Sequence, residues 1–282
     1  MMKKAVCSIA MVGAMLLAVQ SGLAQNYKGT PHPTIQDYGP FTDTKVQHNN
    51  ITREGPGGGC GNPAASCLFY GGDFHYNPLS ANVANGLANE ATTLIAGSPY
   101  GAAVWVPFTV PASQTWAVTG LFSNNQSDYG VLDQSPLTPT AAAYWAIAEG
   151  IEAGQAGTVI ASGTAAATIN PTGRSAFGLS EYTVEVQGLS FTLTGGSYSM
   201  IVIPLCTNTG NPYCFETFFL SDVEYINGPP KNARGPAEPQ DAAFFDSPFF
   251  FLTFDPTNGL LGACAGIGCD SFSAGIQGTA TN

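Results

Sequence analysis

Three acidic residues could hold a metal ion near the two ends of the region that we expect to fold. Asp73, Glu90 and Asp270 offer carboxylate oxygens, which are ligands that calcium prefers. Sandwich domains often hold a structural calcium ion between their first and last strands, where Asp73 and Asp270 fall. No motif requires a cofactor, and a structural calcium ion is the one candidate. The alternative is that these acids are ordinary turn residues.

Three aromatic residues could stack against sugar rings. Trp105 is out of phase with Val104 and Val106, so its side chain belongs to the opposite face of that strand. If that face is open, Trp105 is exposed, and Tyr100 and Tyr129 from turn-rich segments extend it into a platform. The alternative is that Trp105 packs under the N-terminal part of the chain.

Paired carboxylates suit glycoside hydrolysis, and Glu181 and Glu185 project from one strand face. Their spacing puts them about 13 Å apart along a strand. That exceeds the ~5–9.5 Å that either stereochemical outcome requires. We expect a solvated face instead, with Glu181, Thr183, Glu185 and Gln187 in water and the alternate residues Tyr182, Val184 and Val186 inward.

Nucleophilic catalysis has little support in this sequence. His75 stands beside Asp73, but no motif identifies a serine that would complete a triad. The segment 173–177 lacks the second glycine of a nucleophile elbow. His32 and His48 fall in a loose N-terminal segment. Whether the protein is an enzyme stays open, and the balance favours a non-enzyme.

Six cysteines follow the leader in three close couples. The couples are Cys60 and Cys67, Cys206 and Cys214, and Cys264 and Cys269. An even number in an exported chain indicates disulfides, and six cysteines allow 15 connectivities. We expect pairing within each couple, because each encloses Gly, Pro or Asn that lets a short loop close. Zinc is the alternative, but only the third couple approaches a zinc-knuckle spacing.

The N-terminus has the parts of a secretory signal peptide in their usual order. A basic start with Lys3 and Lys4 precedes an apolar run, and small residues favour cleavage before Gln25. Residues 1–24 are thus the predicted leader, with an N-terminal membrane anchor as the alternative. No later segment has 18 apolar residues, so we expect a secreted, extracellular protein, with the periplasm as the alternative.

Charge excludes two classes of partner. The 282-residue chain has 8 basic and 19 acidic residues, a net charge of −11. Two of the basic residues lie in the leader, so six remain and the mature net charge is −13. Nucleic acids and anionic lipid surfaces need clustered Lys and Arg, so neither is expected as a partner.

Short alternating runs with Gly and Pro turns predict strands in the body of the chain. We expect an extended N-terminal arm over 25–68 and a single domain over 69–282, with a Pro-rich surface loop at 227–240. The predicted fold is all-β, an antiparallel β-sandwich that is jelly-roll-like. The clearest strands are 104–110, 116–122, 157–163, 181–187, 197–205, 215–226, 249–254 and 271–276.

The segment 138–153 is ambiguous between helix and strand. It has a helix start signal and an alanine run, and Tyr144, Ile147 and Ile151 sit at helical spacing. The residue pattern favours a helix by a small margin, while the strands on both sides favour a strand.

Several motifs resemble those of uncharacterised exported bacterial β-sandwich proteins, some of which carry a PEP-type sorting tail. The resemblance covers about residues 100–205 and implies a strand over 143–151. This sequence has no such tail, and the family supplies no activity. The motifs are Pro107–Gly120, Ala143–Ile147, Gly157–Gly163, and Thr172–Gly178 leading into Glu181–Val184.

We expect a secreted, non-catalytic β-sandwich protein that binds glycans or other cell-surface or matrix components. A purely structural extracellular protein without a small ligand is the alternative, and a secreted glycan-active hydrolase is the less favoured one.

Overall fold

A computed structural model describes residues 60, 66–74, 86–89, 100–127, 142–176, 179–205, 219–223, 233–235, 243–248, 251–257 and 271–282. All of them lie in one compact unit, Pro33–Asn282. Every element in these ranges is a strand, so the predicted all-β class is confirmed. The strands are β1 (Cys67–Tyr70), β2 (Gly86–Ala88), β3 (Ala103–Ser127), β4 (Ala142–Glu149), β5 (Thr158–Ala176), β6 (Leu179–Pro204), β7 (Phe219–Val223), β8 (Phe244–Ser247), β9 (Leu252–Pro256), β10 (Ser271–Phe272) and β11 (Ala274–Thr281).

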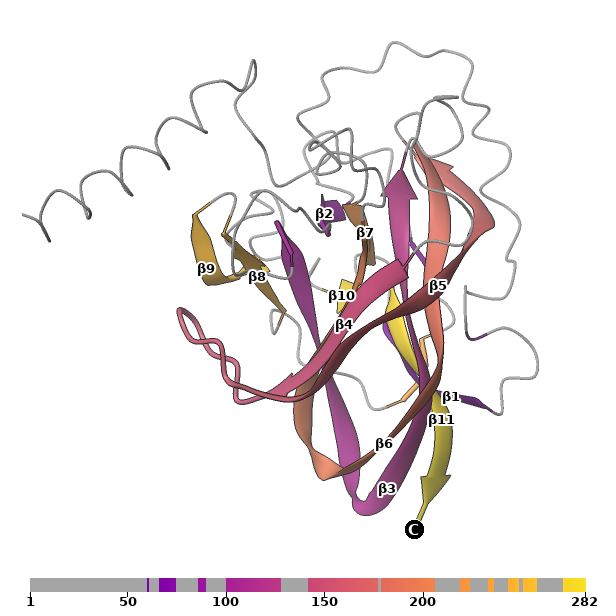
Figure 1. Cartoon of the computed structure of the whole chain (residues 1–282), viewed down its shortest axis with the longest axis vertical. Coiled ribbons are helices and arrows are strands. Elements are labelled where there is room, and N and C mark those ends of the chain that lie inside the picture. The colour runs from indigo at the N-terminus through magenta and orange to yellow at the C-terminus, as the bar shows by residue number, and fades with distance from the viewer. Residues whose placement is uncertain are drawn as a thin grey trace, which may run out of the picture. The chain divides into compact units, whose positions relative to one another are not determined.

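The strands form an antiparallel sheet whose main order is β1-β11-β3-β6-β4-β5 (Figure 1). β3 and β6 are its central pair, from Val106 opposite Met200 to Ser127 opposite Ser180. β11 lies between β1 and β3, so segments about 200 residues apart in the sequence are neighbours. The hairpin of β8 and β9 joins the start of β3, and β7 joins its end.

β3 and β6 turn back together near their midpoints (Figure 1). Val110 lies opposite Gly196 and Thr115 opposite Thr194, so β3 has extra residues at 111–114. A side chain at Gly195 would place its Cβ 2.5 Å from Ala112 Cα, which only glycine avoids. The segment 111–114, between the predicted strands 104–110 and 116–122, is therefore a bend within one continuous strand rather than a connection between two.

One apolar cluster takes residues from both arms of this bend. The predicted inward faces of 104–110 and 184–186 are confirmed, because these side chains are buried. A core shared by both arms is consistent with the predicted sandwich. The cluster includes Val104, Val106, Phe108, Val110, Trp116, Val118, Trp145, Val184, Val186, Leu193 and Phe272.

The ambiguous segment is strand β4, as the family resemblance implied, and the helical reading is wrong. β4 pairs with β5 on one side and with β6 on the other. Trp145 and Ile147 pack in the main cluster, while Ala146 and Ala148 pack in a second cluster on the opposite face. A strand buried on both faces has no polar alternation, so its periodicity resembles that of a buried helix.

The predicted leader, the predicted arm and the predicted Pro-rich loop lie wholly or mostly outside the described residues. β1 begins inside the predicted arm over 25–68, at Cys67. Of the predicted loop at 227–240, residues 233–235 are exposed, and Arg234 forms a backbone bridge with Tyr70. Within the ranges that the structure describes, no helix is long and apolar enough to span a membrane.

Candidate functional site

Polar side chains of three neighbouring strands share one face of the sheet. Directly opposite residues of antiparallel strands point to the same side. Gln277 of β11 lies opposite Gly120 of β3, which lies opposite Gln187 of β6. We call the set that shares this side the polar face. Its members are Glu181, Thr183, Glu185, Gln187, Asn124 and Gln277.

A bulge in β3 decides which residues reach the polar face. Val118 pairs with Gly278 and Gly120 pairs with Gln277, so Thr119 is an extra residue. An extra residue reverses the alternation beyond it. Val118 and Leu121 therefore both point into the core, while Phe122 and Asn124 point to the polar face.

The far end of the polar face is a buried ionic cluster. Arg174 Nε lies 2.5 Å from Glu181 Oε2, and Arg174 Nη1 lies 3.2 Å from Asp73 Oδ1. The Thr172 hydroxyl donates to the same Glu181 oxygen at 2.7 Å. Glu181 is 0% exposed and Arg174 is 8% exposed, so the prediction that Glu181 and Thr183 face water is wrong. The segment 70–74, distant in the sequence, contributes the residues that cover them.

The surroundings keep Arg174 charged and the Tyr70 hydroxyl protonated. Burial opposes the charge of Arg174, but Glu181, Tyr70 and Asp73 together raise the pKa of its guanidinium above the ordinary value. Burial, and then the Asp73 charge, raises the pKa of the Tyr70 hydroxyl well above its ordinary value. Tyr70 therefore stays protonated and donates to Asp73 Oδ1 at 2.7 Å.

Neutral hydrogen bonds extend the cluster across the sheet. Asn124 Nδ2 donates to the Tyr70 hydroxyl at 3.1 Å and to the Ser273 hydroxyl at 2.8 Å. The Thr183 hydroxyl donates to Asn124 Oδ1 at 2.7 Å. The cluster thus joins the end of β1 to β3, β5, β6 and the residue before β11. Because its carboxylates are buried and already paired, it is suited to hold the fold rather than to contact a polymer.

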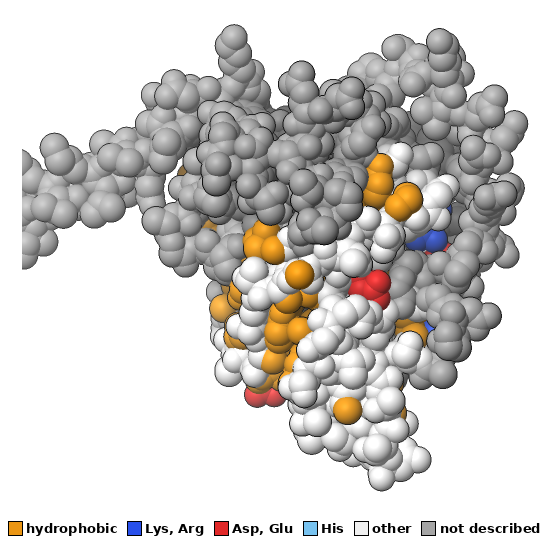
Figure 2. All heavy atoms as spheres, turned by 45° about the vertical axis from the view of Figure 1, so that its right-hand side comes forward, with side chains coloured by type: hydrophobic (Ala, Val, Ile, Leu, Met, Phe, Trp, Pro, Cys, Tyr) orange, Lys and Arg blue, Asp and Glu red, His pale blue; other side chains and the backbone are white. Residues whose placement is uncertain are grey.

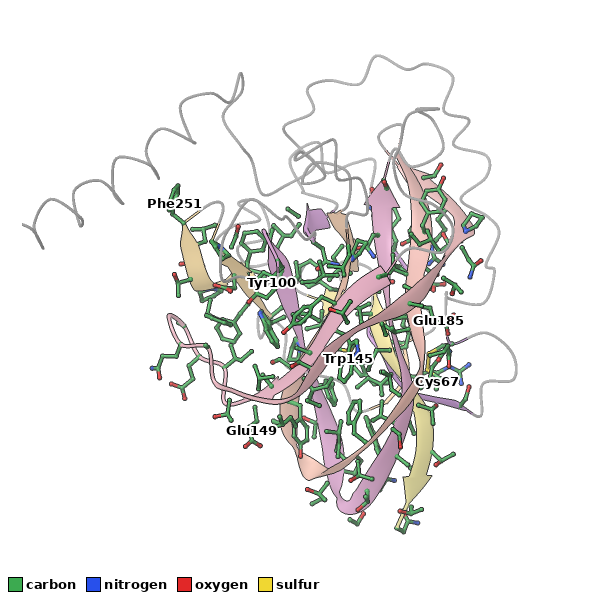
Figure 3. All side chains as sticks on the ribbon, viewed as in Figure 1. Cys67, Tyr100, Trp145, Glu149, Glu185 and Phe251 are labelled. Carbon is green, nitrogen blue, oxygen red and sulfur yellow. A yellow bond between two sulfur atoms is a disulfide. The ribbon has the colours of Figure 1, made fainter. Side chains whose placement is uncertain are left out.

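The near end of the polar face is open and has a different composition. The amides of Gln187 and Gln277 donate to Glu185 Oε1 at 2.5 and 2.6 Å, and Gln187 also donates to Gln277 Oε1. Gln187 is exposed, Glu185 is half-buried, and Gln277 beneath them is 6% exposed; Glu185 is labelled on the right in Figure 3. Gly120 leaves the space for this cluster, since a Cβ there would lie 2.5 Å from Gln277 Oε1.

Hydroxyl side chains continue this open surface in two cross-strand rows. The first row is Thr281, Thr115 and Thr194, and the second has Thr279 and Thr192 on either side of Ala117, which has no hydroxyl. Glu185 is the one charged side chain among the described residues of this open region. Figure 2 shows a face on which uncharged groups predominate and charged side chains are few.

Glu181 and Glu185, the two carboxylates weighed for glycoside hydrolysis, belong to different clusters. Glu181 belongs to the buried ionic cluster, whereas Glu185 belongs to the open amide cluster. Their hydrogen-bond partners are different, so the two groups have separate environments. His75 lies outside the described residues.

The hypothesis of an exposed aromatic platform fails for two of its three residues, and the alternative of a packed Trp105 is the one that fits. Trp105 is 3% exposed, and its ring lies 6.1 Å from that of Phe254 in β9. Tyr100 is 8% exposed and donates to Asp246 Oδ2 at 2.6 Å. The β8–β9 hairpin contributes the residues that pack there (Figure 3). Tyr129 lies outside the described residues.

Asp246 is an unusual carboxylate in this covered region. Its burial raises the pKa of the Asp246 carboxyl above the ordinary value, although the hydrogen bond from Tyr100 opposes this. Burial, and then Asp246 itself, raises the pKa of the Tyr100 hydroxyl. The pair therefore couples the hairpin to the segment before β3 in a pH-dependent way.

The predicted calcium ligands are not brought together in the part of the chain that the structure describes. Asp73 is paired with the cation Arg174, which does not fit a calcium ligand. Glu90 and Asp270 lie outside the described residues. Among the residues that are described, no three His, Cys, Asp or Glu side chains form a group that could hold a metal ion.

One predicted disulfide is confirmed. Cys60 and Cys67 are bonded, with Cα atoms 5.2 Å apart, and they pack against Tyr70 and Phe122. The pairs Cys206–Cys214 and Cys264–Cys269 lie outside the described residues and stay predictions.

Sequence reasoning missed Arg174 and Gln277. Arg174 is one of only six basic residues after the leader, and it stands seven residues before Glu181 across a hairpin connection. That spacing was a usable signal for a cross-strand ion pair. Gln277 had no signal, because only the pairing of β11 with β3 brings it beside Glu185.

No protein-family model matches the chain, and a search of curated proteins finds no match to it either.

Proposed function

We propose that this is an exported, non-catalytic protein that binds neutral polysaccharide through the open end of its polar face. The observation that supports this proposal most directly is the convergence of Glu185, Gln187 and Gln277 on a surface with few charges. A carboxylate accepts from two vicinal sugar hydroxyls in a bidentate manner, and an amide can accept from one hydroxyl and donate to the other.

The cluster is suited to binding because its side chains already hold one another. Each amide is hydrogen-bonded to Glu185, so less side-chain entropy is lost when a ligand binds. The threonine rows beside it offer further donors and acceptors to an extended chain of sugars.

Charge supports a neutral ligand over an acidic one. The chain carries a net charge of −11, and the only basic residues among those described are Arg174, which is buried, and Arg234. Acidic polysaccharides, nucleic acids and anionic lipids would all be repelled. The Cys60–Cys67 disulfide supports export to an oxidising compartment. A structural calcium ion held by Asp73 is not part of this proposal, because that carboxylate is paired with Arg174.

The test is a polysaccharide pull-down and a glycan array with the intact exported chain. Glu185→Gln and Gln187→Ala should each weaken binding by about tenfold or more, since they remove one strong hydrogen-bonding group each. Glu149→Gln and Gln155→Ala are matched controls at exposed positions in and beside the β4–β5 connection, and they should bind as the wild type does. Equal binding by all four variants would show that Glu185 and Gln187 do not bind the polysaccharide, which would contradict the proposal.

A structural extracellular role is the second candidate, favoured by the uncharged free edge of β5. The array separates the two, because a purely structural protein binds no glycan. A hydrolase is the less favoured reading and predicts release of reducing sugar from a bound polysaccharide.

A further inference from the structure

We propose that the free edge of β5 pairs with β5 of a second copy of this chain. β5 pairs with β4 through its first part and with β6 through its second part. Among the described residues no strand pairs with its other side, and it ends the main strand order. An edge strand presents unpaired backbone N–H and C=O groups that can add a further strand.

This edge lacks the side chains that usually prevent such pairing. Monomeric proteins protect long edges with Lys, Pro or repeated bulges. Residues 153–173 of this chain contain no charged side chain, and Pro171 is the one proline among them. Two register shifts occur in β5, one where Ile147 pairs with Ala161 and Ala148 with Val159, and one between Pro171 and Ser175, so residues 161–171 pair without a shift.

Small and apolar side chains leave the edge approachable. Ala161, Gly163 and Ala165 alternate with the exposed residues Ser162 and Thr164, so no large side chain blocks a second strand. At the start of β5, Val159 is 50% exposed and Ile160 is 41% exposed. Burial of these two side chains would favour association.

Self-complementarity favours a second copy as the partner, and the distribution of charge permits it at this edge. Two chains with a net charge of −11 each repel one another over most approaches. The uncharged stretch at 153–173 is where they can approach without placing like charges together. Antiparallel pairing about a twofold axis is self-complementary, and it can place serine and threonine of the two copies opposite each other.

The test is the dimer dissociation constant, measured by analytical ultracentrifugation of the exported chain. Thr164→Glu puts a like charge on each copy at the shared edge and should raise this constant by about tenfold or more. Thr119→Glu adds the same charge at the exposed bulge of β3, a strand with neighbours on both sides, and should change it far less.

Two further measurements keep the result decisive. Equal melting temperatures for the two variants show that both fold. Added salt should strengthen the wild-type dimer, because it screens the net repulsion without weakening an uncharged interface. A wild type that stays monomeric at its highest soluble concentration, a dimer that salt weakens, or equal effects of the two variants would each overturn the proposal. Glycan binding per chain is a separate readout, since Thr164 lies outside the Glu185 cluster.

Discussion

Arg174 and Glu181 face each other across the β5–β6 hairpin, with 2.5 Å between Nε and Oε2, in a region closed to solvent. Asp73 completes the cluster from a segment about 100 residues earlier. Arg174 therefore links the β5–β6 hairpin to the segment that follows β1. The energetics of this cluster can be tested, because each charge depends on the others for compensation.

Replacing Arg174 should destabilise the fold strongly. Arg174→Met leaves the carboxylates of Glu181 and Asp73 buried without a cation, which typically costs about 3–5 kcal/mol of unfolding free energy. Urea unfolding measures this loss. Arg234→Met is the matched control, because Arg234 is exposed and its described contacts with Tyr70 are through the backbone. A loss no greater than that of the control would show that the ion pair does not hold the hairpin.

Replacing Asp246 should stabilise the protein at neutral pH. The folded state raises the pKa of this carboxyl above its ordinary value of 3.8, so it binds the proton more tightly than the unfolded chain does. The resulting stabilisation is complete below that ordinary value and is lost as pH rises through the folded pKa. Asp246→Asn should therefore raise the melting temperature at pH 7 and reduce its dependence on pH, while its amide oxygen still accepts from Tyr100.

The control for this effect is Glu149→Gln, at an exposed carboxylate at the end of β4. It removes one exposed negative charge, so the melting temperature at pH 7 should change less than it does for Asp246→Asn. A melting temperature of Asp246→Asn below that of the wild type at pH 7 would contradict the prediction.

Loss of the Cys60–Cys67 disulfide should lower stability by a moderate amount. The bond closes a loop with a sequence separation of 7, and loss of so short a loop costs about 2–3 kcal/mol through the entropy of the unfolded chain. Chemical unfolding of the double variant Cys60→Ser, Cys67→Ser measures the effect. Ser66→Ala, at the exposed position beside Cys67, should be neutral. A double variant as stable as the wild type would mean that the loop is ordered without the bond.

The bend of β3 and β6 should depend on Gly195 more than on Gly196. Gly195→Ala would place a Cβ 2.5 Å from the Ala112 backbone, so a strand must move, at a cost of about 1–3 kcal/mol. Gly196→Ala meets the Tyr198 hydroxyl at 3.3 Å, which a side chain can accommodate more easily. Thermal unfolding of both variants tests the order, and a larger loss for Gly196→Ala would refute this account of the bend.

Alternation in the sequence predicted which residues share a face, but not whether that face is covered. The pattern at 181–187 correctly separated Glu181, Thr183, Glu185 and Gln187 from the inward valines. It placed all four in water, because the covering residues at 70–74 are too distant in the sequence to enter a local pattern. The pattern left Trp105 open between an exposed and a covered face for the same reason, since the β8–β9 hairpin lies about 140 residues later.

The sequence by itself determined the all-β class, the turn at 111–114, the inward faces of the long strands and one short disulfide. These features follow from local spacing, from the fixed φ of proline and the conformational freedom of glycine, and from the short reach of a seven-residue separation. Only the tertiary structure decided that Arg174 meets Glu181, that Gln277 meets Glu185, and that β4 is covered on both faces. The physical reason is that strand pairing across the whole chain sets these contacts, and a single bulge at Thr119 changes which side chains take part.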